Sequence, residues 1–299
     1  MSTGRPTVAS PPGPDSFGVR FRHHLSLARI SNSPTVISNV LAGTALATAL
    51  TFNDIVVVIA IAMVLFYTAG MYLNDLFDLE WDRTRNATRA LPSGAVSVRE
   101  ALTGIIGFTI VGLVLLALTT WWAFASGVVL LGVIVAYDRW HKGNPLSPLF
   151  MAATRILVYV TAFLAFSTDL TWELGAWCLL LLLYVAGLTS IAKTEHGNPA
   201  TRYWPIAALL LPAVFALIQQ PMVGTVALVL LFVTWIVYAC SFVFRATGKS
   251  IGGAIGRLIA GIALVDALVL ASVDSAWGVI VALIAFVGTF VFQRHIKGT

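Results

Sequence analysis

Long apolar runs separated by short polar segments make up most of the chain. The stretch 101–137 carries no charged residue and is too long for one core helix, but it fits two membrane spans of about 20 residues each. The runs are continuous and do not alternate in segments of roughly ten residues, which favours helices over an outer-membrane barrel. We therefore predict an all-α, polytopic membrane helical bundle with nine to ten transmembrane helices. The ranges are 33–53, 55–74, 101–119, 121–137, 148–167, 174–192, 203–219, 221–243, 252–272 and 275–292.

Composition supports a membrane protein and excludes an ordinary soluble fold. Hydrophobic residues make up 59% of the 299 residues and charged residues only 10%, against about 25% in soluble domains. Two cysteines, Cys178 and Cys240, lie within apolar runs, where a thiol behaves as a small hydrophobe. No disulfide framework is expected.

The basic residues indicate the topology. All 18 lysines and arginines lie in the N-terminal tail, in loops after even-numbered spans, or close beside those loops. The turns after odd-numbered spans contain none. By the positive-inside rule, both termini and the even-numbered loops are cytoplasmic, in a protein of the cell membrane. The net charge of +5 therefore reflects topology, and we expect no nucleic-acid partner.

The chain is expected to have one folded domain. Residues 1–28 are predicted to form a disordered cytoplasmic tail, because the first 20 residues are rich in Pro, Gly and Ser. Residues 29–299 would form a single transmembrane domain. The tail lacks the apolar stretch of a signal peptide, so no cleavage is expected.

An acidic motif follows the second predicted span. The segment 74–82, with the sequence NDLFDLEWD, places four carboxylates within eight residues. On a continuing helix, Asn74, Asp78 and Asp82 share one face. A hard divalent cation relieves the repulsion between such carboxylates, and Mg²⁺ takes oxygen ligands, usually together with substrate phosphates. The motif predicts a diphosphate held through Mg²⁺; the alternative is a solvated acidic helix end beside the basic stretch 83–99.

The motif and the loop after it also resemble a known family. Together with Arg89-Ala-Leu-Pro92-Ser-Gly94, the motif is similar to the first aspartate-rich motif and following loop of the UbiA-type intramembrane prenyltransferases. Arg29 and Pro34 before the first span, and polar loops after the fourth and sixth spans, extend the resemblance along the chain.

The resemblance implies a helical bundle around a central cavity. The diphosphate of a prenyl donor would bind through Mg²⁺ at the cytoplasmic mouth, and the isoprenoid tail would lie in an apolar tunnel. Asn74, Asp78 and Asp82 would hold the metal, Asp75 would join Asp78 and Asp82 as a catalytic residue, and Arg89 would bind substrate. An aromatic or other lipophilic acceptor would be alkylated as the pyrophosphate departs.

The loop after the sixth span departs from the usual family pattern. Many members carry a second aspartate-rich motif there, whereas this chain has Lys193-Thr-Glu195-His196-Gly-Asn198. Glu195 is predicted to replace an aspartate as a catalytic residue and metal ligand, and Lys193 to bind phosphate, but paired carboxylates are missing. Such a reduced motif is similar to that of less characterised bacterial branches of the superfamily. The alternative is a basic interfacial helix end.

Ionisable residues within predicted spans are further candidates, because such groups usually face a cavity or a partner. Arg155 lies ~10 Å into the fifth span and is predicted to bind the diphosphate, with snorkelling as the alternative. Arg257 and Asp266 share the ninth span but should not pair. Asp266 is predicted to line the acceptor pocket, or else to form a structural hydrogen bond. In the loop after the fourth span, Asp138 is expected to contact substrate, where it could help bind a second cation.

Other function classes fit part of the pattern. A secondary transporter would also have about ten spans and buried charges, but its charges would concentrate at the membrane midplane. A lipid-linked transferase that acts on polyprenyl phosphate would share the fold and first motif, and a non-enzymatic scaffold is the third alternative. The oligomeric state does not follow from the sequence, since Gly252-x-x-x-Gly256 suits bundle packing as well as a dimer.

Overall fold

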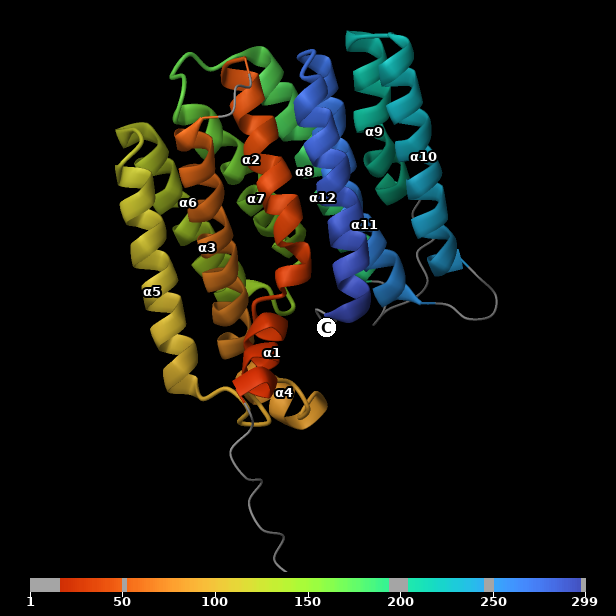
Figure 1. Cartoon of the computed structure of the whole chain (residues 1–299). Helices are drawn as coiled ribbons and strands as arrows, with labels where there is room; N and C mark the ends of the chain where they lie inside the picture. The colour runs from red at the N-terminus through yellow and green to blue at the C-terminus, as the bar shows by residue number, and fades with distance from the viewer. Residues whose placement is uncertain (1–16, 50–52, 194–203, 245–249, 297–299) are drawn as a thin grey trace, which may run out of the picture.

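The computed structural model describes residues 17–49, 53–193, 204–244 and 250–296, which form an all-α bundle (Figure 1). The predicted fold class is confirmed. Each of the ten predicted ranges overlaps one helix, and α1, η1 and α4 are additional. The elements are α1 (Phe17–Leu27), the 3-10 helix η1 (Ile30–Asn32), α2 (Ser33–Ala47), α3 (Asp54–Phe77), α4 (Leu79–Arg85), α5 (Val98–Ala117), α6 (Trp121–Trp140), α7 (Ser147–Leu164), α8 (Trp172–Lys193), α9 (Trp204–Gln219), α10 (Val223–Phe244), α11 (Ile251–Ser272) and α12 (Ala276–His295).

Most of these helices have the length of a membrane span. Among the described residues, eight helices are long and apolar enough to cross a membrane: α3, α5, α6, α7, α8, α10, α11 and α12. The other two predicted ranges form shorter helices, α2 with 15 residues and α9 with 16. Helix α2 ends at Ala47, where the backbone of Thr48 becomes extended, so the predicted range 33–53 is too long.

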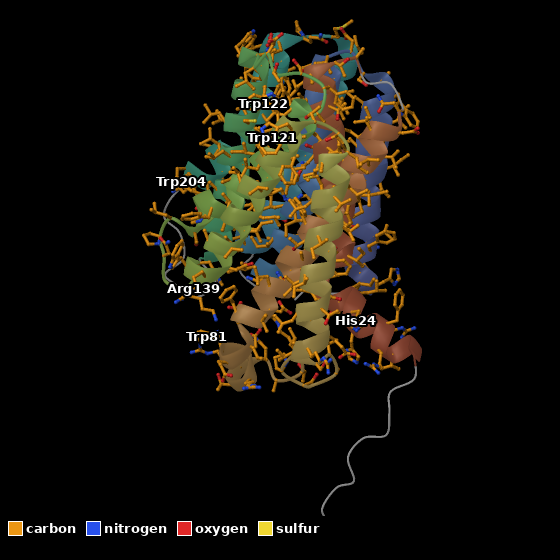
Figure 2. The ribbon with its side chains drawn as sticks, turned by 90° about the vertical axis from the view of Figure 1, so that its left-hand side faces the viewer. His24, Trp81, Trp121, Trp122, Arg139 and Trp204 are labelled. Atoms are coloured by element: carbon orange, nitrogen blue, oxygen red, sulfur yellow. The ribbon has the colours of Figure 1, made fainter. Side chains whose placement is uncertain are left out.

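Tryptophan side chains lie at both ends of the bundle (Figure 2). Trp121 and Trp122 are exposed near one end, and Trp81 is exposed near the other, on the same side as Arg139. Tryptophan is enriched at the two water interfaces of a bilayer. This arrangement fits helices that run across the membrane.

Helix α1 lies inside the range 1–28 that we expected to be disordered, so for residues 17–27 the structure differs from that expectation. Leu27 is 2% exposed and packs in a small apolar cluster with Tyr72 of α3. Arg20 forms an ion pair with Glu100 of α5. The composition of the tail did not reveal this helix, because its stabilising contacts are made with residues far along the chain.

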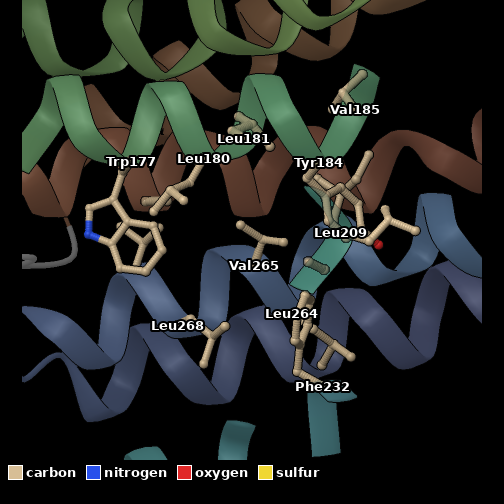
Figure 3. Packing of buried hydrophobic residues seen from close by; sticks show 14 of the residues in the cluster. Trp177, Leu180, Leu181, Tyr184, Val185, Leu209, Phe232, Leu264, Val265 and Leu268 are labelled. Carbon is tan, nitrogen blue, oxygen red and sulfur yellow. The ribbon is translucent and has the colours of Figure 1, made fainter. Parts of the chain in front are cut away.

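Buried apolar side chains fill the bundle on both sides of α2. One cluster joins α8, α9, α10 and α11 around the fully buried Trp177, Tyr184 and Phe232 (Figure 3). A second cluster joins α2, α3 and α6 and includes Phe66. Large apolar side chains on α5 and α10 are exposed, as expected for helices that face lipid.

Candidate functional site

The acidic motif lies where α3 meets α4. Helix α3 ends at Phe77, and Asp78 forms the junction. The amide of Asp78 donates to the carbonyl of Asn74 (3.0 Å), and the amide of Asp82 donates to the carbonyl of Asp78 (2.8 Å). The helical register therefore continues through the junction. Asn74 and Asp82 are buried while Phe77 is exposed, so the polar face of the motif turns toward the protein.

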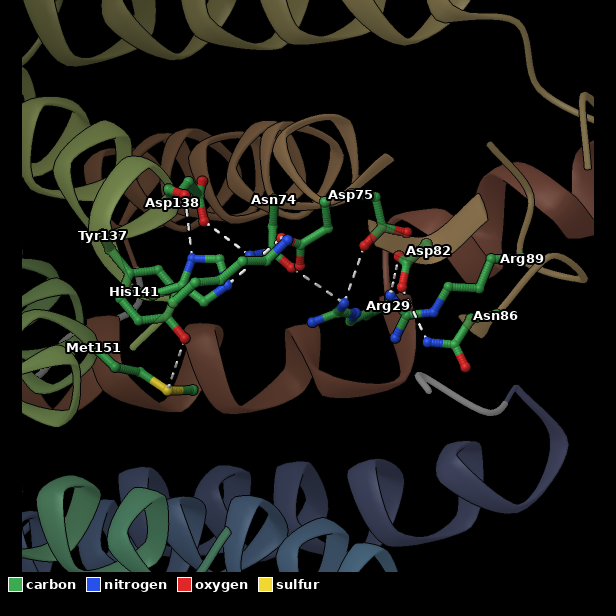
Figure 4. Close-up of polar contacts among 12 residues, drawn as sticks. Arg29, Asn74, Asp75, Asp82, Asn86, Arg89, Tyr137, Asp138, His141 and Met151 are labelled. Atoms are coloured by element: carbon green, nitrogen blue, oxygen red, sulfur yellow. Dashed lines mark hydrogen bonds and ion pairs between the residues drawn. The ribbon is translucent and has the colours of Figure 1, made fainter. Parts of the chain in front are cut away.

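Three carboxylates of the motif each lie against a basic side chain from outside the motif. Figure 4 shows two of these pairs, Arg29 with Asp75 and Arg89 with Asp82. The pairs are Arg29 with Asp75 (3.0 Å), Arg89 with Asp82 (2.6 Å) and Lys142 with Asp78 (2.6 Å). The contact of Lys142 with Asp78 joins two charges without hydrogen-bond geometry. The three cations come from the start of η1, the loop between α4 and α5, and the loop between α6 and α7. Segments far apart in the sequence thus converge on the motif.

Arg29 connects the N-terminal segment to the motif. Its guanidinium donates to both Asp75 (3.0 Å) and Asn74 (3.3 Å), while its backbone carbonyl accepts from the hydroxyl of Tyr67 (3.2 Å). Its backbone is left-handed, with φ 44° and ψ 44°, which costs a non-glycine residue about 1–2 kcal/mol. Sequence reasoning included Arg29 in the resemblance but not among the site residues. The available signal was a lone arginine directly before the first apolar run.

Asp138, near the end of α6, adds a fourth carboxylate to those of Asp75, Asp78 and Asp82. Its Oδ1 accepts from the amide of Asn74 (3.0 Å), which ties α6 to α3. Its Oδ2 is buried and has no hydrogen-bond partner among the described residues. Four carboxylates thus lie beside three Arg or Lys side chains, and the carboxylate left without a cation is that of Asp138. This part of the protein favours an additional cation.

The oxygen donors fit Mg²⁺ by their chemistry. Within the described ranges, no group of three His, Cys, Asp or Glu side chains is placed to hold a metal ion by itself. Mg²⁺ is usually bound by only one or two carboxylates, with waters and substrate phosphates completing its shell. Asp138 Oδ2 is an unpartnered oxygen of the required kind. The residues present therefore suit a magnesium ion that binds together with a phosphate ligand.

Asn74, Asp78, Asp82 and Asp138 together form what we call the acidic cluster. An apolar cavity adjoins this cluster at Asp138. It lies between α2, α3, α6 and α7, has a volume of about 100 Å³ and is partly open to the outside. Phe66, Leu130 and Val158 contribute apolar walls. The charged lining residues, among those the structure describes, are Asp138 and Arg155. A mostly apolar pocket with a few polar groups suits a ligand with a long apolar part and a polar head.

Arg155 and Asp266 belong to one buried polar network. Arg155 Nη1 donates to the side-chain carbonyl of Asn39 (3.0 Å), and the amide nitrogen of Asn39 lies 2.9 Å from both carboxylate oxygens of Asp266. The hydroxyls of Ser38 and Tyr159 also donate to Asp266. Asp266 is fully buried and is not a lining residue of the cavity. This geometry favours the structural hydrogen-bond interpretation of Asp266 over a place in the acceptor pocket.

Three other candidates lie elsewhere or cannot be placed. Lys193 is the last residue of α8; its side chain, and the whole of Glu195, lie outside the described residues. Arg257 does not line the cavity. Its guanidinium lies 3.9 Å from the ring centroid of Phe242, and its Nη1 donates to the carbonyl of Gly253 (2.6 Å). These contacts are those of a structural residue on α11.

Residues 36–251 match the UbiA prenyltransferase family. The chain belongs to this family. The match covers most of the chain and confirms the resemblance that the acidic motif indicated. Together with the long apolar helices, it identifies a multi-pass integral membrane protein. The proposed relationship to a branch with a reduced second motif stays a prediction.

Curated relatives are similar in sequence to segments of this chain. It is 39% identical over 85 residues to digeranylgeranylglyceryl phosphate synthase of Natronomonas pharaonis, and 29% identical over 161 residues to the synthase of Sulfurisphaera tokodaii. The matched segments cover 28% and 54% of this chain. They cover 31% and 56% of the relatives, so the chain matches about a third to about half of their length.

Solved UbiA structures share the fold. A structure from work on digeranylgeranylglyceryl phosphate synthase in membranes has a TM-score of 0.60 and 17% identity, covering 91% of this chain and 99% of that one. A UbiA homologue from Archaeoglobus fulgidus bound to GPP and Mg²⁺ has a TM-score of 0.60 and 14% identity, covering 84% of this chain and 99% of that one.

Proposed function

We propose that this protein is a Mg²⁺-dependent membrane prenyltransferase that moves an isoprenoid group from a prenyl diphosphate to a lipophilic acceptor. The observation that carries the proposal is the acidic cluster of Asn74, Asp78, Asp82 and Asp138 beside an apolar cavity that also contains Arg155. The arrangement suits a ligand with a charged head and a long apolar tail. The family match and the fold shared with a homologue bound to GPP and Mg²⁺ support the same donor class.

The acidic residues would hold the metal in this proposal. Asn74, Asp78 and Asp82 share one face of α3 and α4, and Asp138 adds an oxygen from α6 that has no other partner among the described residues. Bound Mg²⁺ would neutralise charge on the departing pyrophosphate. Glu195, which lies outside the described residues, is proposed as a further ligand.

The basic residues around the cluster would bind the phosphates. Arg29 and Arg89 now pair with carboxylates at 3.0 and 2.6 Å, and both can turn donors to phosphate oxygens. Asp75 would hold Arg29 in place for this role. Arg155 would contribute from the cavity wall, and Lys193 from the end of α8.

The chain's main contribution to the reaction would be position and charge. The bond between the allylic carbon and the diphosphate oxygen breaks, and its electron pair leaves with the pyrophosphate. A nucleophilic atom of the acceptor forms the new bond to that carbon and releases its proton. The apolar cavity walls would keep water from the electron-deficient carbon before the acceptor reacts.

The names of the relatives support one acceptor class. Proteins named digeranylgeranylglyceryl phosphate synthase match parts of this chain, so we propose a prenylated glyceryl phosphate as the first acceptor to test. An aromatic acceptor is the other class that the resemblance implied.

The donor site is tested with Asp78→Asn. Geranyl, farnesyl and geranylgeranyl diphosphate are titrated onto wild-type protein in lipid nanodiscs with and without Mg²⁺, and pyrophosphate release is followed in the same samples. Wild type should bind at least one donor in a Mg²⁺-dependent way. Asp78→Asn should lose this binding, because it removes a central charge of the acidic face while conserving the side-chain shape.

The matched control is Glu80→Gln in the same motif. The Glu80 side chain is 83% exposed and pairs with Arg83, so its loss should leave donor binding unchanged. Equal affinity of Asp78→Asn and wild type would contradict the metal site. Wild-type protein that binds none of the three donors would contradict the proposed function and favour a polyprenyl phosphate substrate or a transporter.

A further inference from the structure

We propose that Asp266 and Asn39 are positioning residues that hold the guanidinium of Arg155 at the cavity wall for a phosphate oxygen of the donor. The inference rests on the proposed function, because it assigns Arg155 to the donor diphosphate. It concerns a network of three helices, α2, α7 and α11, in which Arg155 is the one member that lines the cavity.

The orientation of the Asn39 amide is set by Asp266. An ionised carboxylate only accepts hydrogen bonds, so the Asn39 amide nitrogen must face Asp266, and it lies 2.9 Å from both carboxylate oxygens. The side-chain carbonyl of Asn39 then faces the opposite way, where it accepts from Arg155 at 3.0 Å. A reversed amide would place donors against the donors of Arg155. Asp266 therefore fixes which group Asn39 offers to Arg155.

Asp266 is itself held in one position. Its carboxylate is fully buried and accepts from the hydroxyls of Ser38 on α2 and Tyr159 on α7, in addition to Asn39. Ser38, Asn39 and Tyr159 are all fully buried as well. Because each group is packed and hydrogen-bonded, the network is rigid and transmits the position of Asp266 to Asn39.

The network also compensates the charge of Arg155 while occupying only one of its N–H groups among the described residues. A cation at membrane depth normally needs a counter-charge. No carboxylate pairs directly with Arg155 among the described residues, and Asp266 supplies its negative charge through the neutral Asn39. A guanidinium has five N–H donors, and the structure shows one of them in a hydrogen bond, to Asn39. The remaining donors can turn to a phosphate in the cavity.

The test is a double-mutant cycle of donor affinity. Dissociation constants for geranylgeranyl diphosphate with Mg²⁺ are measured in nanodiscs for wild type, Arg155→Gln, Asp266→Asn and the double variant. Loss of a hydrogen bond between charged groups should weaken binding in Arg155→Gln by about tenfold or more. Asp266→Asn should also weaken donor binding, because an amide at this position allows the side-chain amide of Asn39 to reverse. The double variant should bind no more weakly than Arg155→Gln alone, since Asp266 acts through Arg155.

A stability control separates positioning from general damage. Thr161→Val removes the buried hydrogen bond between Thr161 of α7 and Ser126 of α6 (2.8 Å), outside the cavity lining. It should lower the thermal midpoint and leave donor affinity unchanged. If Asp266→Asn does not fold, Asn39→Ala removes the same link to Arg155 and takes its place in the cycle.

The outcomes are distinct. Wild-type affinity in Asp266→Asn, or losses that multiply in the double variant, would overturn the inference and leave the donor site intact. Absence of binding in wild type would instead refute the proposed function, and Mg²⁺-dependent binding that survives Asp78→Asn would contradict the metal site.

Discussion

Arg29 combines an unfavourable backbone conformation with contacts to two members of the acidic motif. The left-handed backbone of a non-glycine residue persists only where its surroundings hold it. Here Tyr67 holds the carbonyl, while Asn74 and Asp75 hold the guanidinium. This placement brings a planar cation, able to form two parallel hydrogen bonds with a phosphate, next to the proposed metal ligands.

Arg29→Ala should therefore affect both stability and donor binding. The variant leaves the mostly buried carboxylate of Asp75 without its cation, and a hydrogen bond to a charged group contributes about 1.5–3 kcal/mol. We expect the free energy of unfolding to fall by about that amount, and donor affinity to fall with it. Thermal unfolding and donor titration in nanodiscs measure the two effects.

The control for this prediction is Arg20→Ala. Arg20 also forms an ion pair, with Glu100, but its side chain is 52% exposed, so its loss should have a small effect. An Arg29→Ala protein that matches Arg20→Ala in stability and binds the donor as wild type does would refute the role of Arg29.

Local spacing could predict part of the site but not its partners. The positions of Asn74, Asp78 and Asp82 on one face follow from helical periodicity, and the structure keeps that register. The contact of Asn74 with Asp138 joins residues 64 positions apart, and that of Asn39 with Asp266 joins residues 227 apart. Such contacts depend on how the helices pack, which one sequence without tertiary information does not specify.

At the scale of the helices, the close approach of α2 to α7 positions Asn39 next to Arg155. Gly43 of α2 makes this approach possible: a Cβ at this position would lie 2.8 Å from the Cα of Tyr159 and even closer to its carbonyl oxygen. These are backbone atoms, which cannot move aside without shifting α7. The glycine is one helical turn from Asn39, so the same contact surface carries the polar network.

Gly43→Ala should separate the two helices. Overpacking of this kind costs about 1–3 kcal/mol, and we expect a lower thermal midpoint together with weaker donor binding, because Asn39 moves away from Arg155. Gly132→Ala on α6 is the matched control, since no atom lies within 4 Å of its added Cβ. If the two alanine variants unfold at the same temperature, α2 and α7 are not in the close contact that the structure shows.

The helices themselves were predictable to a large extent, because hydrophobic length determines a membrane span. The exceptions have local causes. Helix α2 stops early at Ala47, and α1 forms because Leu27 is buried against Tyr72. Hydropathy along the chain predicts neither the extended conformation at Thr48 nor the surface on which α1 packs.

For the whole molecule, the important relation is between the polar site and the membrane. The acidic cluster lies at the C-terminal ends of α3 and α6 and on α4. The apolar cavity adjoins it between the helices. Lysines and arginines gather in the loops of the same end, whereas the turns after odd-numbered spans have none. By the positive-inside rule, we expect the acidic cluster to face the cytoplasm, where a diphosphate and Mg²⁺ are available in water.

Cysteine accessibility tests this orientation. Ala87 lies in the exposed loop after α4, and Asp169 in the exposed turn between α7 and α8. Each is replaced singly, as Ala87→Cys and Asp169→Cys, in a background where Cys178 and Cys240 are alanine. A membrane-impermeant maleimide should label Asp169→Cys in intact spheroplasts and should reach Ala87→Cys only after permeabilisation. The opposite pattern would place the acidic cluster on the outer face, so that a donor made in the cytoplasm would have to cross the membrane before it could react.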